Sequence, residues 1–170
     1  LIPMGFKKTS ETISISGEVT ETGANTFTQS EITLPLDPLN NEVFVVLAID
    51  IDVGMPSNVA ATPTQVSGSL ATTSQTGVIG INNTRCLAKG IKAIAQGAGT
   101  VDGAAFTEVE GNTPNANLDF IAIIATDNFF AQVEGGGNLA AKTMRFRMWG
   151  FRAKADSATY AALVQSELLS

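Results

Sequence analysis

Lys-Thr-Met-Arg-Phe-Arg-Met-Trp-Gly-Phe-Arg-Ala-Lys, residues 142–154, is the stretch that decides the fold class. Three apolar residues in it alternate with two arginines and a tryptophan: Met144, Phe146 and Met148 against Arg145, Arg147 and Trp149. Successive side chains of a β-strand point to opposite faces, so a period of two predicts a strand. We predict that its apolar face lies in a core and that its cationic, aromatic face lies outside.

Other segments show strand patterns and are separated by turn residues. The strongest is 43–53, whose odd-numbered residues are predicted to face one way; its first half is apolar on both faces, which predicts a central strand. Residues 118–126 predict a second central strand. Shorter strands are predicted at 11–20, 26–36, 65–70, 76–81, 106–110 and 129–134, while 86–96 fits a strand or a helix, with a strand favoured. Eight to ten short strands predict an all-β, antiparallel β-sandwich.

The end of the chain changes period. Tyr160, Leu163, Val164 and Leu168 fall at helical spacing, and Asp156 or Ser157 is placed to cap the first turn. This pattern predicts a short amphipathic helix, which either packs on its own sandwich or docks on a neighbouring subunit. The predicted organisation is an N-terminal extension over 1–10, a β-sandwich domain over 11–155 and a C-terminal helix over 156–170.

The composition argues against catalysis and against cofactors. The 170 residues include no histidine, which removes the commonest general base and metal ligand, and one cysteine, Cys86, which we expect to pack as a small hydrophobic side chain. No apolar run approaches the length of a membrane span, and no signal peptide is visible. The chain begins at Leu1, which leaves open whether a leader is removed or the sequence starts inside a longer product.

The charge is negative overall and unevenly distributed. The formal net charge is −6, and residues 1–84 hold two lysines against eight carboxylates, whereas five cations gather in 142–154. An acidic chain argues against direct nucleic-acid binding, which needs clustered cations. Trp149 and Phe151 beside arginines could stack on bases or sugars, but packing between strands or subunits is the better interpretation.

Asp50 and Asp52 are the weak candidates for a metal site. They share one face of the 43–53 strand, and two carboxylates next to loop carbonyls can bind a hard cation such as calcium. The ordinary alternative is two solvated acids where a strand leaves the core. Because no third carboxylate stands at the spacing of a calcium loop, we predict no metal site.

Four features of the layout support a comparison with a known family: the size, the number of strands, the long strand at 43–53, and the ending, which runs from Asp127-Asn128-Phe129-Phe130 through Gly137-Asn138 to 145–152. In this layout the chain resembles a single jelly-roll capsid protein of a tailless icosahedral virus. The resemblance implies a jelly-roll sandwich and a structural role in a virion. Many such proteins carry a basic N-terminal arm for the genome; only Lys7 and Lys8 stand here, which again argues against direct genome binding.

The function predicted from these observations is a self-assembling capsid subunit in a virion, with other copies and other capsid proteins as partners. The predicted interface is the cationic part of the last strand: Arg145, Arg147, Trp149, Arg152 and Lys154. These groups would pair with acids of another copy; pairing with acidic strands of the same subunit is the alternative.

Three other functions remain open at this point. A secreted filament or adhesion subunit, extracellular or on a cell surface, would use residues 1–10 to complete a neighbour's sheet. A phage tail-tube or decoration protein is the second, and a β-sandwich lectin with a calcium-dependent sugar site at Asp50 and Asp52 is the third.

Overall fold

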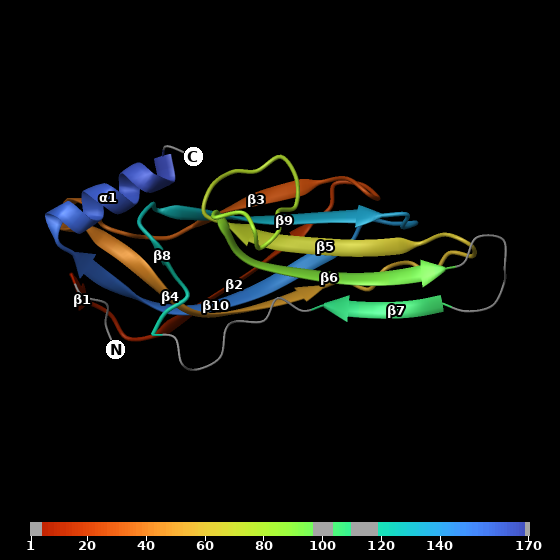
Figure 1. Ribbon diagram of the computed structural model, residues 1–170, viewed down its shortest axis with the longest axis horizontal. Coiled ribbons are helices and arrows are strands. Elements are labelled where there is room, and N and C mark those ends of the chain that lie inside the picture. The colour runs from red at the N-terminus through yellow and green to blue at the C-terminus, as the bar shows by residue number, and fades with distance from the viewer. Residues whose placement is uncertain (1–4, 97–103, 110–118, 169–170) are drawn as a thin grey trace.

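The protein is a sandwich of two antiparallel sheets with one C-terminal helix (Figure 1). The structure is a computed structural model that describes residues 5–96, 104–109 and 119–168. Ten strands lie in this part of the chain, and every pair of neighbouring strands is antiparallel. The predicted all-β sandwich class is therefore confirmed.

The first sheet is organised around the strand at the end of the chain. Its order is β1 (Phe6–Lys8), β10 (Thr143–Ala155), β4 (Glu42–Val53) and β8 (Ala122–Ile124), and β2 (Ile13–Thr20) pairs with β10 on the same side as β1. The second sheet has the order β3 (Thr28–Thr33), β9 (Asn128–Gly136), β5 (Thr64–Ala71), β6 (Cys86–Gln96) and β7 (Ala104–Val109). A short 3₁₀ helix, Pro38–Asn40, connects β3 to β4.

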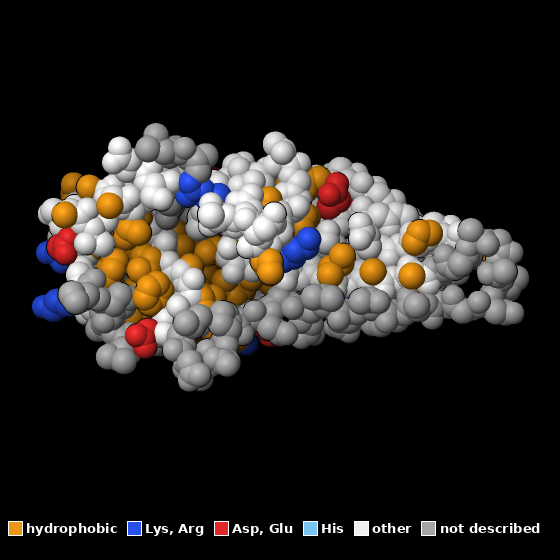
Figure 2. All heavy atoms as spheres, viewed as in Figure 1, with side chains coloured by type: hydrophobic (Ala, Val, Ile, Leu, Met, Phe, Trp, Pro, Cys, Tyr) orange, Lys and Arg blue, Asp and Glu red, His pale blue; other side chains and the backbone are white. Residues whose placement is uncertain are grey.

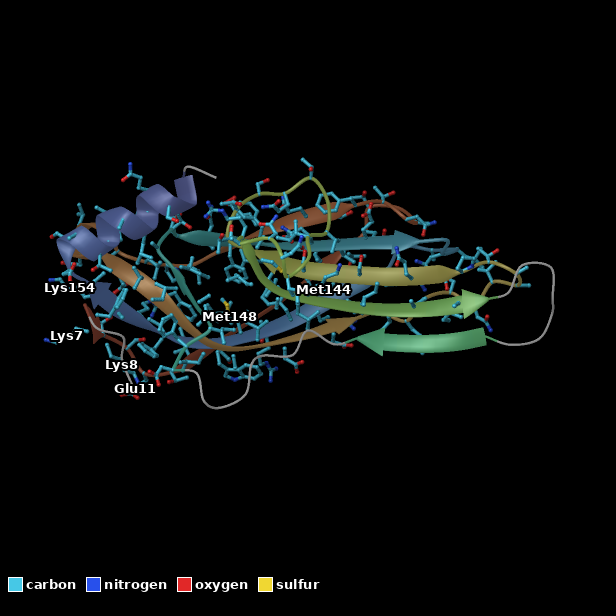
Figure 3. The ribbon with its side chains drawn as sticks, viewed as in Figure 1. Lys7, Lys8, Glu11, Met144, Met148 and Lys154 are labelled. Atoms are coloured by element: carbon cyan, nitrogen blue, oxygen red, sulfur yellow. The ribbon has the colours of Figure 1, made fainter. Side chains whose placement is uncertain are left out.

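The main core lies between the two sheets. Met144 and Met148 point into it from β10, as predicted, and both are fully buried (Figure 3). Phe146 meets Phe129 of the opposite sheet edge to face, with ring centroids 5.7 Å apart, a favourable aromatic geometry. The alternation of β10 therefore places Met144, Phe146 and Met148 against the second sheet and Arg145 and Arg147 outside.

A β-bulge in β4 changes which residues face this core, and it overturns one prediction. Register shifts opposite Trp149 and Gly150 so that Leu47 is the extra residue of β4. Ile49 and Ile51 lie in the core between the sheets, but beyond the bulge Phe44 and Val46 take that role. Val43 and Val45 instead belong to a second apolar cluster on the opposite face. The odd-numbered residues of β4 thus do not share one face. The prediction of a strand buried on both sides is confirmed, since residues 43–46 are all buried.

Helix α1 (Ser157–Leu168) covers that second cluster, so it packs on its own sandwich. Tyr160, Leu163 and Val164 lie against a floor formed by Val43, Val45, Phe151, Ala153 and Ala155. The Asp156 side chain accepts a hydrogen bond from the Thr159 amide at 2.8 Å and caps the helix, as predicted. That hydrogen bond lowers the pKa of the Asp156 carboxyl.

Three further predictions differ from the structure. Residues 118–126 were predicted as a central strand, but β8 is a three-residue strand that pairs only with β4; its apolar residues are explained by contacts with both clusters. Residues 76–81 form no strand and belong to a long connection between β5 and β6. Within the predicted N-terminal extension, residues 6–8 form β1 at the edge of the first sheet. The other predicted strands are found with small shifts at their ends; Glu110 and Leu118 lie outside the described residues.

Where β2 and β9 end and β10 begins, a buried carboxylate, Glu21, closes the sandwich; it is 4% exposed. Its two oxygens accept hydrogen bonds from the backbone amides of Thr26, Gly135 and Lys142 at 2.7, 2.9 and 2.9 Å. Asn138, 5% exposed, adds bonds to the β4–β5 loop and to β5. These side chains satisfy loop amides that would otherwise be buried without partners.

Candidate functional site on the outer face of the first sheet

The outer face of the first sheet carries three rows of side chains across β2, β10 and β4. Each row holds one residue of each strand in register: Ser14, Trp149 and Ala48; Ser16, Arg147 and Asp50; Glu18, Arg145 and Asp52. They share one face because they alternate with the core residues of their strands. We call these nine residues the outer rows. The fold therefore brings three of the predicted interface residues and both candidate metal ligands onto one surface.

The row of Glu18, Arg145 and Asp52 holds two separate ion pairs inside the subunit. Arg145 Nε lies 3.3 Å from Glu18 Oε2, and both side chains are more than half exposed. Lys92 of β6 reaches Asp52 Oδ1 at 3.4 Å. Exposed pairs of this kind contribute little to stability, but they hold the side chains in place and neutralise one another. Arg145 therefore pairs with an acid of its own subunit, which was the alternative to pairing with another copy.

The central row is less complete. Arg147 Nε donates a hydrogen bond to Ser16 Oγ at 3.1 Å, and its guanidinium carbon lies 5.9 Å from the centre of the Trp149 ring. Within the described residues, the terminal nitrogens of Arg147 have no acceptor, and the carboxylate of Asp50 has no donor or ion-pair partner. Arg147 and Asp50 are directly opposite in the ladder. The row thus presents unused donors and unused acceptors side by side.

These residues line a shallow pocket of about 430 Å³. Trp149 forms one wall, and its neighbours across both strands are the small residues Ser14 and Ala48. Trp149 is partly buried, and we infer that these small neighbours leave part of its side chain accessible. The pocket therefore combines an aromatic surface with hydrogen-bonding groups that point in fixed directions, as small-molecule sites do.

The geometry gives no support to a metal site at Asp50 and Asp52. In the part of the chain that the structure describes, no three His, Cys, Asp or Glu side chains come close enough to share a metal ion. Asp52 is held by the ammonium group of Lys92, which competes with a cation for that carboxylate. Asp50 and Asp52 share one face of β4, as predicted, because both stand in register with outward-facing residues of β10.

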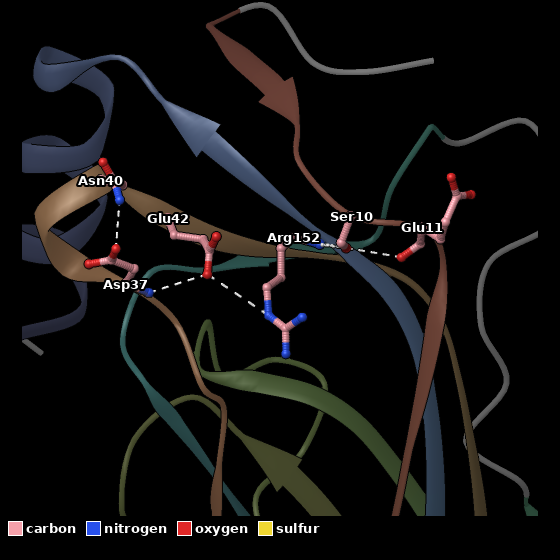
Figure 4. Close-up of polar contacts among 6 residues, drawn as sticks. All are labelled: Ser10, Glu11, Asp37, Asn40, Glu42 and Arg152. Carbon is pink, nitrogen blue, oxygen red and sulfur yellow. Dashed lines mark hydrogen bonds and ion pairs between the residues drawn. The ribbon is translucent and has the colours of Figure 1, made fainter.

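Arg152 and Lys154, the other two predicted interface residues, lie on the opposite face of β10. Arg152 stands in register with Phe44, a core residue, and its Nε is 3.9 Å from Glu42 Oε1 (Figure 4). Lys154 is exposed and lies directly opposite Lys7 of β1 in the ladder. The five predicted interface residues therefore form two groups on different faces.

The group at the β1 edge is cationic. Figure 3 shows Lys7 and Lys154 together at one end of the molecule. Figure 2 shows Lys or Arg side chains at the surface of the same end. Neither lysine has an ion-pair partner among the described residues. Like charges directly opposite in a ladder destabilise it, but Glu42 of β4 stands opposite Lys154 on the other side of β10. Lys8 points to the other face, 4.9 Å from the centre of the Phe151 ring.

Cys86 is the only free thiol and is partly buried at the start of β6. Burial raises the pKa of the Cys86 thiol, while the charge of Lys89 opposes this shift. A raised pKa keeps the thiol protonated and unreactive at neutral pH. This agrees with the expected packing role.

Four residues of these surfaces were missed by sequence reasoning: Ser16, Glu18, Lys92 and Lys7. The polar face of β2 was visible in the alternation of Ile13 and Ile15 with serines. Its pairing with β10 joins residues more than 120 positions apart, which one sequence does not reveal.

Comparison with family models, with curated proteins and with solved structures finds no match to this chain. No helix in the described residues has the length and apolar character needed to cross a membrane. The functional argument therefore rests on the fold and on the two surfaces.

Proposed function

We propose that the sandwich is a jelly roll and that the protein is a subunit of a self-assembling shell, a viral capsid. The observation that carries this proposal is the nesting of its strand pairs. β2 pairs with β10, β3 with β9, β4 with β8, and β5 with β6. Nested pairs arise when one long antiparallel ribbon is rolled into two sheets, and the neighbours β10–β4 and β9–β5 are the seams of such a roll.

The fold alone does not assign a function, because jelly rolls serve in capsids, lectins and enzymes alike. An enzymatic role finds no support in a chain without histidine whose single thiol has a raised pKa. A structural role is supported by the composition: 15% of the residues are charged, so much of the surface is uncharged and suited to burial between copies.

The contact between copies is proposed at the cationic β1 edge. Lys7 and Lys154 have no ion-pair partner among the described residues, although Glu42 stands opposite Lys154 in the β10–β4 ladder and already pairs with Arg152. The chain as a whole carries a net charge of −6, so acidic surface is plentiful on a second copy. Attraction between different patches gives a head-to-tail contact, which closes into rings when the rotation permits. Arg145 is paired with Glu18 and Arg147 is oriented by Ser16 on the outer face, so we assign them a different role below.

Electron microscopy with size-exclusion chromatography of the purified full chain tests the proposal. We expect closed, isometric particles. The double substitution Lys7→Glu/Lys154→Glu should prevent their formation while leaving the subunit folded, because it replaces attraction to acidic surface by repulsion. Lys142→Glu/Lys89→Glu is the matched control, since it changes the same charge away from β1. Subunits that stay monomeric, or particles that form equally well from both double variants, would contradict the proposal.

Fibres in the same micrographs would favour the filament or adhesion subunit instead. That function requires an N-terminal segment that completes a neighbour's sheet. In this structure residues 6–8 occupy the edge of their own sheet, bonded to β10. This arrangement supports the shell over the filament.

A further inference from the structure

We propose that the pocket in the outer rows binds a neutral saccharide, with Trp149 as the stacking surface and Arg147, Asp50 and Ser16 as the hydrogen-bonding groups. This binding site goes beyond the assembly role and does not depend on it. It requires no metal ion, unlike the calcium-dependent site considered from the sequence.

The chemistry of the central row matches adjacent hydroxyl groups. A sugar hydroxyl both donates and accepts a hydrogen bond, so two neighbouring hydroxyls can donate to a carboxylate and accept from a guanidinium at once. Asp50 has an unused acceptor and Arg147 has unused donors, and the two residues are directly opposite in the ladder. Hydrogen bonds to ionised groups are the stronger kind.

Trp149 supplies the apolar part of the site. Sugars present C–H groups on one face, and these pack on an aromatic ring whose face is rich in electrons. The ring is flanked by Ser14 and Ala48, which are too small to cover it. Arg147 lies over part of the ring and is held by Ser16, so the aromatic and polar groups keep a fixed relation.

The charge of the pocket indicates a neutral ligand. Its lining holds three carboxylates, Glu18, Asp50 and Asp52, and two arginines, and Lys92 contacts Asp52 from outside the lining. A surface without an excess of positive charge offers no advantage to a phosphate, a nucleic acid or an acidic sugar. This distinguishes the outer rows from the cationic β1 edge.

The site is also organised before a ligand arrives. All of its lining residues among those the structure describes stand on the adjacent strands β2, β10 and β4. Strands fix the backbone positions of these residues, so binding does not have to order a loop. The pocket is shallow and open, so we expect a weak interaction with single sugars, with a Kd on the order of 1 mM.

Trp149 makes the test direct, because it is the only tryptophan of the chain. The full-length protein is titrated with galactose, mannose and N-acetylglucosamine, and separately with N-acetylneuraminic acid, while tryptophan emission is recorded. We expect at least one neutral sugar to change the emission in a saturable way and to bind more tightly than the acidic sugar. No saturable change with any of the three, confirmed by an unmoved indole N–H signal in NMR spectra, overturns the proposal.

Two variants locate the binding. Asp50→Ala removes the free acceptor and should raise the Kd at least about tenfold. Glu11→Ala removes an exposed carboxylate outside the pocket and should leave the Kd unchanged. Equal Kd values in the two variants would place the binding elsewhere and refute the assignment. The variants are also compared by electron microscopy: if Asp50→Ala changes the particles and no sugar binds, the outer rows are a contact between copies and the saccharide proposal is wrong.

Discussion

Gly150→Ala is the substitution that most directly tests how β10 and β4 fit together. Gly150 follows the point where the ladder shifts register, and it lies on the core face beside Phe44. A Cβ added there would stand 2.3 Å from the carbonyl oxygen of Val45 and 2.5 Å from the Phe44 ring. Real Cβ atoms do not approach so closely, so the backbone of β4 or a fully buried ring must move by about 1 Å.

The loss of stability depends on which neighbouring groups can move away from the added methyl group. Overpacking a core costs about 1–3 kcal/mol when side chains can shift, and a backbone carbonyl in a ladder yields less than a side chain. We therefore expect Gly150→Ala to lower the free energy of unfolding by about 3 kcal/mol. For a chain of this size that corresponds to a fall in Tm of about 6–12 °C.

Thermal unfolding followed by circular dichroism measures this effect on dissociated subunits, where assembly does not add to stability. Gly77→Ala is the control, because a Cβ at Gly77 meets nothing within 4 Å and its φ is not positive. Its Tm should stay within about 2 °C of the parent protein. Equal Tm values for the two variants would refute the inference that the bulge brings β4 against β10 at this point.

Two further predictions concern buried groups. Glu21→Gln should lower the free energy of unfolding, measured in urea, by about 2–3 kcal/mol, because an amide NH2 would replace an oxygen that accepts a backbone N–H. Glu31→Gln, which changes an exposed residue, should have little effect. Equal effects of the two substitutions would contradict the closing role of Glu21. Cys86 should react with iodoacetamide more slowly in the native protein than in the urea-unfolded chain at pH 8, since its pKa is raised. Because the unfolded thiol loses its proton first, stability should fall as the pH rises above the ordinary thiol pKa of 9.0, and native and unfolded rates that agree would contradict the burial of this thiol.

Local alternation predicted most of the strands and the inward face of β10. Met144, Phe146 and Met148 face the core as expected, because one face of a sandwich strand must be buried. The cap at Asp156 and the helix after it were also predictable, since capping and helical spacing are local properties.

The division of the cationic residues into two faces was not drawn from the sequence, although the alternation implies it. Arg145 and Arg147 are odd-numbered, and Arg152 and Lys154 are even-numbered, so one regular strand cannot present all four on one side. The identity of their partners is a different matter. Glu18, Ser16 and Lys7 come from strands far away in the sequence, and their register depends on the packing of the whole sandwich.

The bulge at Leu47 explains why β4 could not be assigned to faces from its pattern. Residues 43–49 are apolar without interruption, so no polar residue marks the point where the alternation shifts. The shift in register fits the sheet because the outer face of β4 is exposed to solvent at one end and covered by α1 at the other. At one end the second sheet covers the inner face and the outer face meets solvent, so acids alternate with core residues. At the other end α1 covers the outer face as well, so both faces of β4 are apolar.

β10 has no bulge, so its outward-facing residues change along the strand from Arg145 and Arg147 through Trp149 to Phe151 and Ala153. Trp149 stands at the boundary between the charged and the apolar part of that line. A ring with an apolar body and a polar edge suits this boundary, and the same position leaves it partly open to a ligand.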